Sequence, residues 1–218
     1  GFLIICIMTN NFNIPTEYLT DDEMAKLGEI VTRLNELEKR DIYQQNFIDF
    51  VKHVWPAFIQ GKHHKTYAEK LQNVADGKST RLIVNMPPRH TKSEFASYLF
   101  PSWLMGRKPT SKIIQATHTS ELAVGFGRKV KNLIDSSEFS DIFPGVSLAT
   151  DAKASGRWST NKGGEYYAVG VGGALAGRGA DFLIIDDPVS EQDALSPSAL
   201  DNIYEWYTSG PRQRLQPG

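Results

Sequence analysis

Short apolar runs alternate with helical patterns over most of this chain, and this alternation restricts its fold more than any other feature. Three runs have the length and flanking turn residues of buried strands: residues 82–86, 112–117 and 182–185. Three helical patterns lie between or after them: residues 94–99, 120–134 and 197–209. Because helices that connect parallel strands cover the faces of the sheet, the sequence predicts an α/β fold with a mainly parallel central sheet flanked by helices.

Two further patterns complete the expected α/β domain. Residues 66–75 are expected to form a helix that ends before Gly77, and residues 158–171 a hairpin around the turn at 161–164. In the helix at 120–134, four apolar side chains are expected to face inward: Leu122, Phe126, Val130 and Leu133.

Composition limits the function more by exclusion than by indication. The chain has 218 residues, of which 40% are hydrophobic and 22% charged, the profile of one globular domain with a full-sized core. Its net charge of −1 gives no overall attraction to nucleic acid, so a DNA contact would need a local patch such as residues 61–92, with seven basic residues against two acidic ones. The single Cys6 excludes an internal disulfide and suits a reducing cytoplasm.

The first 60 residues are expected to form a helical N-terminal extension to a domain at residues 61–218. Residues 1–8 are apolar but too short to cross a bilayer, and they lack the basic segment of a signal peptide, so no targeting role is expected. Thr20 and Glu23 form a capping-box pattern ahead of an amphipathic helix at residues 21–39, which we interpret as a packing or docking helix. A second helix is expected at residues 46–54.

A phosphate-binding loop is predicted at residues 86–93, Met-Pro-Pro-Arg-His-Thr-Lys-Ser. A strand, a tight turn, a lysine and a hydroxyl that opens a helix are the parts that hold phosphates, with Lys92 on the β- and γ-phosphates and Ser93 on Mg²⁺. Met86 and Thr91 stand where the usual pattern has glycine, and a basic turn before a core helix is the simpler alternative. The nucleotide-binding candidates are Pro88, Arg89, His90, Thr91, Lys92 and Ser93.

A pair of acids follows the apolar run at 182–185. Such a strand would bring Asp186 and Asp187 to the carboxyl edge of the sheet, where ligands bind in open α/β folds. Asp186 would hold Mg²⁺, and Asp187 would orient or deprotonate the attacking water. The alternative is that Asp-Asp-Pro only starts a turn. The phosphate loop and the acidic strand together, in this order, indicate a P-loop ATPase that binds ATP and Mg²⁺.

Arginine and histidine side chains offer further candidates. Arg178 lies near the end of a segment, residues 163–179, that contains seven glycines, and it would suit an arginine finger or else form a surface salt bridge. Arg89 competes for the finger role or senses phosphate. His63 and His64 are neighbours in sequence and so do not share a helix face; they would line the adenine pocket or cap the following helix rather than hold a metal.

Two smaller signals have structural explanations. Thr117 or Thr119 is expected to cap the helix at residues 120–134. Trp158 and Tyr166 on the hairpin are expected in the core or in a contact between protomers, with stacking on a nucleic-acid base as the alternative.

From about residue 46 to its end, the chain resembles the large terminase subunit of tailed bacteriophages. The resemblance is carried by five stretches: residues 82–94, 114–123, 156–168, 177–188 and 204–217. It implies an ASCE-type P-loop ATPase that pumps double-stranded DNA into a procapsid. Lys92, Ser93 and Arg89 match the family's phosphate-loop residues, Asp186 its metal carboxylate and Asp187 its catalytic acid, which is more often Glu in related ATPases. Arg178 matches the expected finger.

The resemblance also implies partners and a location. These are the portal protein, the small terminase subunit and a homo-oligomeric ring, a pentamer, at the procapsid portal in the host cytoplasm, with no membrane contact. The family's coupling strand and nuclease would come after residue 218, so the chain is expected to be a truncated form, a split-gene fragment or a short natural form. Two other functions stay open: a non-catalytic nucleotide-binding or assembly module, and a P-loop helicase.

Overall fold

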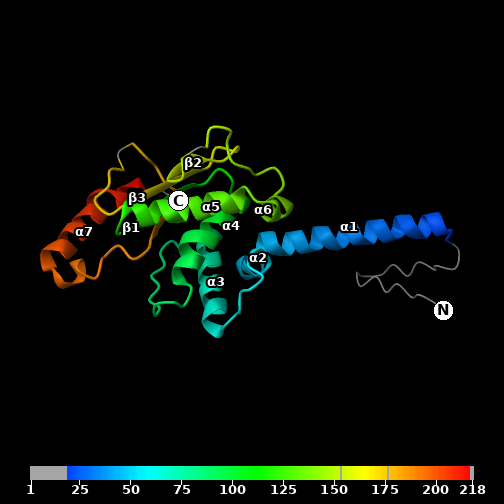
Figure 1. Ribbon diagram of the computed structural model, residues 1–218, viewed down its shortest axis with the longest axis horizontal. Coiled ribbons are helices and arrows are strands. Elements are labelled where there is room, and N and C mark those ends of the chain that lie inside the picture. The colour runs from blue at the N-terminus through cyan, green and yellow to red at the C-terminus, as the bar shows by residue number, and fades with distance from the viewer. Residues whose placement is uncertain (1–18, 153, 176, 217–218) are drawn as a thin grey trace. The chain divides into compact units, whose positions relative to one another are not determined.

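The structure is a computed structural model that describes residues 19–152, 154–175 and 177–216 (Figure 1). The apolar run at residues 1–8 lies outside the described residues. The chain divides into two compact units, Gly1–Ile42 and Tyr43–Gly218. Within the described residues, no helix is long and apolar enough to cross a membrane.

Helix α1, Asp21–Gln45, makes up the described part of the first unit and ends in the second. It begins at the capping box expected from the sequence: the Glu23 carboxylate accepts a hydrogen bond from the Thr20 amide at 2.8 Å, and Thr20 Oγ1 accepts one from the Glu23 amide at 3.4 Å. The helix predicted from residue 21 is confirmed. None of its residues is buried, and Ile30 and Leu34 are at least half exposed.

The second unit is built on a four-stranded sheet in the order β2-β3-β1-β4. Strand β1, Lys112–Thr117, pairs in parallel with β3, Glu165–Gly170, and with β4, Phe182–Ile185. The short β2, Arg157–Ser159, is antiparallel to β3 and forms the expected hairpin. The predicted α/β fold with a mainly parallel sheet is therefore confirmed.

The helices of this unit are α2 (Phe47–Val54), α3 (Lys62–Ala75), a π-helical turn (Glu94–Leu99) that continues as α4 (Phe100–Arg107), α5 (Ser120–Ile134), α6 (Ser137–Ile142) and α7 (Pro197–Ser209). Most of them precede the first strand, α5 and α6 lie between β1 and β2, and α7 follows β4. Short 3-10 turns lie at Asp193–Leu195 and Pro211–Arg214. The sequence did not predict α4, α6 or the two 3-10 turns.

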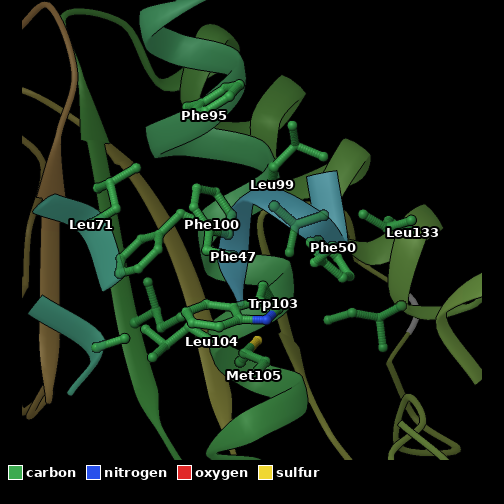
Figure 2. Packing of buried hydrophobic residues seen from close by; sticks show 14 of the residues in the cluster. Phe47, Phe50, Leu71, Phe95, Leu99, Phe100, Trp103, Leu104, Met105 and Leu133 are labelled. Atoms are coloured by element: carbon green, nitrogen blue, oxygen red, sulfur yellow. The ribbon is translucent and has the colours of Figure 1, made fainter. Parts of the chain in front are cut away.

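Aromatic side chains from α2 and from the π-helical turn and α4 form the centre of the core (Figure 2). Phe47 lies edge-on to Phe95 and Phe100 at 5.7 Å and contacts Trp103 at 5.3 Å. Phe47 and Phe50 are fully buried. Because α2 belongs to this core, the two units divide at residues 42 and 43, whereas the sequence placed the division after residue 60.

The hairpin aromatics also belong to the core. Trp158 stacks on Tyr166 at 4.9 Å with an angle of 3° between the rings, and Trp158 Nε1 donates to the Gly127 carbonyl at 3.2 Å. Both rings are buried. The core interpretation of this pair is thus confirmed.

Residues 82–86 do not form a strand, so that prediction is wrong. Leu82, Val84 and Met86 are half-buried and pack against the core, whereas Ile83 is 89% exposed. This alternation is that of an extended chain with one buried face. A strand also needs a neighbour to bond with its backbone, and no other strand in the described ranges pairs with this segment.

The sequence predicted that the helix after the phosphate loop ends before Pro101, and this prediction is wrong. The helix changes to π-helical geometry at Glu94–Leu99, and the Phe100 amide donates to the Phe95 carbonyl, five residues back. Pro101 then lies in the first turn of α4, where its missing N–H costs little. The π-helical turn therefore lets the helix continue through a residue that breaks ordinary α-helical bonding.

Two burial predictions need correction. In α5, Phe126, Val130 and Leu133 are buried as expected, but Leu122 is 39% exposed and Ala123 takes the inward position. Strand β4 was expected to be fully buried, yet all four of its residues are only half-buried. It is an edge strand of the described sheet, so one side lacks a covering neighbour.

Candidate functional site

The phosphate loop has an unusual backbone. Arg89 and Thr91 both have a φ of 62°, a left-handed conformation that non-glycine residues rarely adopt. Helical backbone begins directly afterwards, at Lys92. Glycine is the residue that usually adopts a left-handed φ, and the common phosphate-loop pattern has glycine at this place. Thr91 adopts the same left-handed backbone although it is not glycine. Non-glycine residues with strained backbone angles are found most often at active sites and ligand-binding sites.

Lys92 lies between the two acids that follow β4. Its Nζ is 3.7 Å from Asp186 Oδ1 and also pairs with Asp187 Oδ1. Asp187 has a left-handed φ of 43° and a side chain that is 61% exposed. The structure thus brings together the loop lysine and both acids, 94 and 95 positions apart in sequence, at one edge of the sheet.

A buried polar chain holds Asp186 in place. Ser97, in the π-helical turn, donates to Asp186 Oδ2 at 2.8 Å, and Gln115 Nε2 on β1 donates to Ser97 Oγ at 3.1 Å. Asp186 is only 6% exposed, and Ser97 and Gln115 are fully buried. Gln115 Oε1 has no hydrogen-bond partner within the described residues. The chain connects the helix after the loop, the central strand and the acidic strand.

Helix α3 supports the loop from the other side. Tyr67 Oη donates to the Lys92 carbonyl at 3.2 Å, and burial together with the nearby Asp186 charge raises the pKa of Tyr67, so its hydroxyl stays protonated. His64 Nδ1 accepts a hydrogen bond from the Gly61 amide at 2.8 Å, which confirms a helix-capping role for this histidine. Its Nε2 lies 2.8 Å from Thr91 Oγ1.

The sequence did not identify Ser97, Gln115 or Tyr67 as parts of this site. No motif marks them, because their roles arise from contacts between elements far apart in the chain. A polar Gln in the middle of the apolar β1 run is the one signal that could have been followed, since a buried amide needs partners.

The other candidates lie around this centre. In the loop, Pro88 and Arg89 have exposed side chains, and His90 Nδ1 donates to the Pro88 carbonyl at 2.9 Å. Ser93 follows Lys92 in the first helical turn and is half-buried. The Arg178 guanidinium stacks over Tyr167 of β3, 4.0 Å from the ring centroid, and within the described ranges it forms no ion pair with the two acids.

The residue that caps α5 is Thr119. Its Oγ1 accepts from the Leu122 amide at 3.3 Å, while Thr117 Oγ1 donates to the Thr119 carbonyl at 2.7 Å. Of the two threonines considered from the sequence, the cap is therefore Thr119, and Thr117 orients it.

Ser93 and Asp186 are the residues of this site that could hold a metal ion together with a phosphate. In the part of the chain that the structure describes, no group of three His, Cys, Asp or Glu side chains is arranged to hold an ion. Ser93 and Asp186 supply hard oxygen atoms, which suit Mg²⁺, an ion that usually completes its shell with water and substrate phosphates. The available residues therefore fit Mg²⁺ bound with a nucleotide better than a resident protein-only metal site.

Comparisons with known proteins give no family for this chain, since no protein-family model and no curated protein matches it.

Proposed function

We propose that this chain is a P-loop ATPase that hydrolyses MgATP as the motor domain of a viral DNA-packaging terminase. The observation that supports the site is the position of Lys92 between Asp186 and Asp187, beside a loop with left-handed backbone. A lysine, backbone N–H groups at a helix start and a pair of acids form the combination that binds and hydrolyses a nucleoside triphosphate.

The residues take distinct roles in this proposal. Lys92 and the amides of the loop bind the β- and γ-phosphates, and Ser93 with Asp186 would hold Mg²⁺. The ion supplies positive charge to the phosphate oxygens when bound. Asp187 orients the attacking water and accepts its proton. Ser97 keeps the Asp186 carboxylate oriented through its 2.8 Å hydrogen bond.

The Lys92–Asp187 pair has a consequence for the nucleotide-free state. While Lys92 pairs with Asp187, neither group is free for its proposed task. A triphosphate carries several negative charges and competes for Lys92, which releases the exposed Asp187 carboxylate towards water. Substrate binding would in this way free the catalytic acid only when there is something to hydrolyse.

Translocation and partners rest on the terminase resemblance. In this proposal the chain acts in a homo-oligomeric ring, a pentamer, at the procapsid portal in the host cytoplasm, with the portal protein and the small terminase subunit. Arg178 or Arg89 would then supply charge to the phosphoryl transition state. The basic residues at 61–92 would give a weak, salt-sensitive affinity for double-stranded DNA.

Phosphate release from MgATP tests the proposal. Lys92→Ala should abolish turnover, whereas Lys70→Ala, which removes an exposed lysine on α3 from the same basic stretch, should leave it unchanged. The assay is made over a range of protein concentrations, because a ring predicts activity per chain that rises with concentration. Turnover that survives Lys92→Ala would refute the site.

One observation favours a second candidate, a nucleotide-binding or assembly module without turnover. Asp187 is an aspartate with a short side chain, and it is paired with Lys92. If the pair persisted with nucleotide bound, ATP would bind without hydrolysis. Tight MgATP binding with no phosphate release, at any protein concentration and with double-stranded DNA present, would favour this candidate.

A further inference from the structure

Thr91 is a poor residue for the conformation that it adopts. Its φ of 62° is left-handed, and a β-branched side chain is strained there. Glycine would adopt the same backbone without strain. Such a conformation persists only where the surroundings enforce it, so the contacts of Thr91 should show what holds it.

The Thr91 hydroxyl takes part in two hydrogen bonds. Thr91 Oγ1 donates to the His90 carbonyl at 2.6 Å, so its single proton is used there, and it is left to accept from His64 Nε2 at 2.8 Å. His64 Nδ1 accepts from the Gly61 amide at 2.8 Å, which leaves the ring proton on Nε2. The two bonds of the imidazole therefore require the same tautomer, with Nε2–H directed at Thr91.

His64 is itself packed against aromatic side chains of the core. Its side chain is buried in the first turn of α3, and its ring packs against Phe58 at 4.8 Å and stacks on Phe95 at 5.4 Å. One turn later on the same helix, Tyr67 donates to the Lys92 carbonyl. Two side chains of helix α3 thus bond to successive residues of the loop: His64 to the side chain of Thr91, and Tyr67 to the backbone of Lys92.

We propose that His64 is a positioning residue whose Nε2–H holds Thr91 in the left-handed conformation and so keeps the phosphate loop in its anion-binding shape without glycine. The inference rests on the proposed nucleotide site. We call the His64–Thr91 contact the clamp. In this proposal the clamp stabilises the left-handed backbone that glycine adopts without strain in the usual loop pattern.

The clamp predicts that two substitutions at Thr91 differ in their effect on MgATP affinity, although both remove the hydroxyl. Thr91→Val keeps the β-branch and therefore the strain, but it removes the hydroxyl that His64 holds. Thr91→Gly also removes the hydroxyl, yet it removes the strain with it. MgATP affinity should fall roughly tenfold or more in Thr91→Val and stay within about threefold of wild type in Thr91→Gly.

The double variant separates the clamp from a general role of His64 in folding. His64→Ala should weaken MgATP binding about as much as Thr91→Val, because both leave a strained threonine-like residue unsupported. His64→Ala combined with Thr91→Gly should bind as well as Thr91→Gly alone, since no strained residue then needs support. His64→Gln, whose amide N–H can reach a similar position, should restore part of the affinity.

Two results would overturn the clamp: a double variant as weak as His64→Ala, or a Thr91→Val protein that binds as well as wild type. The second is informative even if His64→Ala destabilises the protein by removing the cap at Gly61, because Thr91→Val leaves that cap intact.

A nucleotide-free measurement makes failure of the clamp distinguishable from failure of the proposed function. Nitrogen NMR of the full chain should show His64 as the Nε2–H tautomer, with a ring proton that exchanges slowly in wild type and faster in Thr91→Val. A proton on Nδ1, or the same exchange in both proteins, overturns the clamp. If wild type binds no MgATP, the proposed function fails, and the clamp is judged by this signal alone.

Discussion

The hydroxyl of Ser97 donates a 2.8 Å hydrogen bond to the buried Oδ2 of Asp186, 89 residues further along the chain. This bond joins the helix that follows the phosphate loop to the end of the acidic strand. The phosphate-loop helix and the acidic strand are therefore connected twice: through the buried Ser97–Asp186 bond and through the Lys92–Asp186 ion pair. A shift of the helix that carries Ser97 would therefore change the position of the Asp186 carboxylate, which is proposed to hold Mg²⁺.

Ser97→Ala should lower the free energy of unfolding by about 2 kcal/mol, because it leaves a buried carboxylate oxygen without its donor. Urea unfolding measures the change. Ser102→Ala is the matched control: Ser102 is equally buried, on α4, but donates only to the Tyr98 carbonyl of its own helical segment. A loss for Ser97→Ala no greater than that for Ser102→Ala would contradict a special role for the bond to Asp186.

Asp187→Asn should separate ATP binding from hydrolysis. The substitution removes the negative charge that pairs with Lys92, so MgATP affinity should stay the same or increase. Hydrolysis should fall by about 10²–10⁴, the usual contribution of a general base. Single-turnover phosphate release and equilibrium binding give the two values, with Asp201→Asn on the exposed face of α7 as control. Equal losses of binding and turnover would argue against Asp187 as the catalytic acid.

The stability of the protein should fall as the pH drops below about 6.5, in part through His64. Burial, followed by the positive charges of His63 and His90, lowers the pKa of His64 from its ordinary value of 6.5. The unfolded chain then binds the proton more readily, so the contribution of His64 is complete above pH 6.5 and is lost as the pH falls through the lowered folded-state pKa. Urea unfolding of wild type and His64→Gln at about pH 7.5 and about pH 5.5 measures this; an equal pH dependence in both proteins would exclude His64 as a source.

Two tyrosines should respond differently to loss of their hydroxyl groups. Tyr166 is fully buried, and its Oη has no hydrogen-bond partner within the described residues, so Tyr166→Phe should leave stability unchanged or raise it by up to about 1 kcal/mol. Tyr67→Phe removes the bond to the Lys92 carbonyl and should cost about 1 kcal/mol. Thermal unfolding of both variants checks the contrast. A clear loss for Tyr166→Phe would mean that its hydroxyl has a partner.

Local patterns account for the elements that the sequence predicted well. Helix α5 begins at its Thr119 cap and α7 at its Ser196 cap, and both helices have the predicted bounds because caps and periodicity are encoded within a few residues. Strand β1 is equally local, a short apolar run between polar ends.

The failures concern relations between distant segments. Residues 82–86 have the composition of a strand, but pairing depends on which segment lies alongside, and composition does not encode this. Likewise, Pro101 signals a helix end only if the preceding turns are α-helical, and the π-helical turn removes that condition. At the site, motif order named Lys92 and the acids, whereas Ser97 and His64 act through tertiary contacts that no motif contains.

The most direct test of the central claim is calorimetric titration of MgATP into wild type, Lys92→Ala and Asp186→Asn. If Lys92 and the acids share one magnesium-bound triphosphate, wild type binds MgATP, Lys92→Ala does not, and Asp186→Asn binds ATP with an affinity that no longer depends on Mg²⁺. Equal MgATP affinity in all three proteins would contradict the account, because the three side chains would then lie together without forming a nucleotide site.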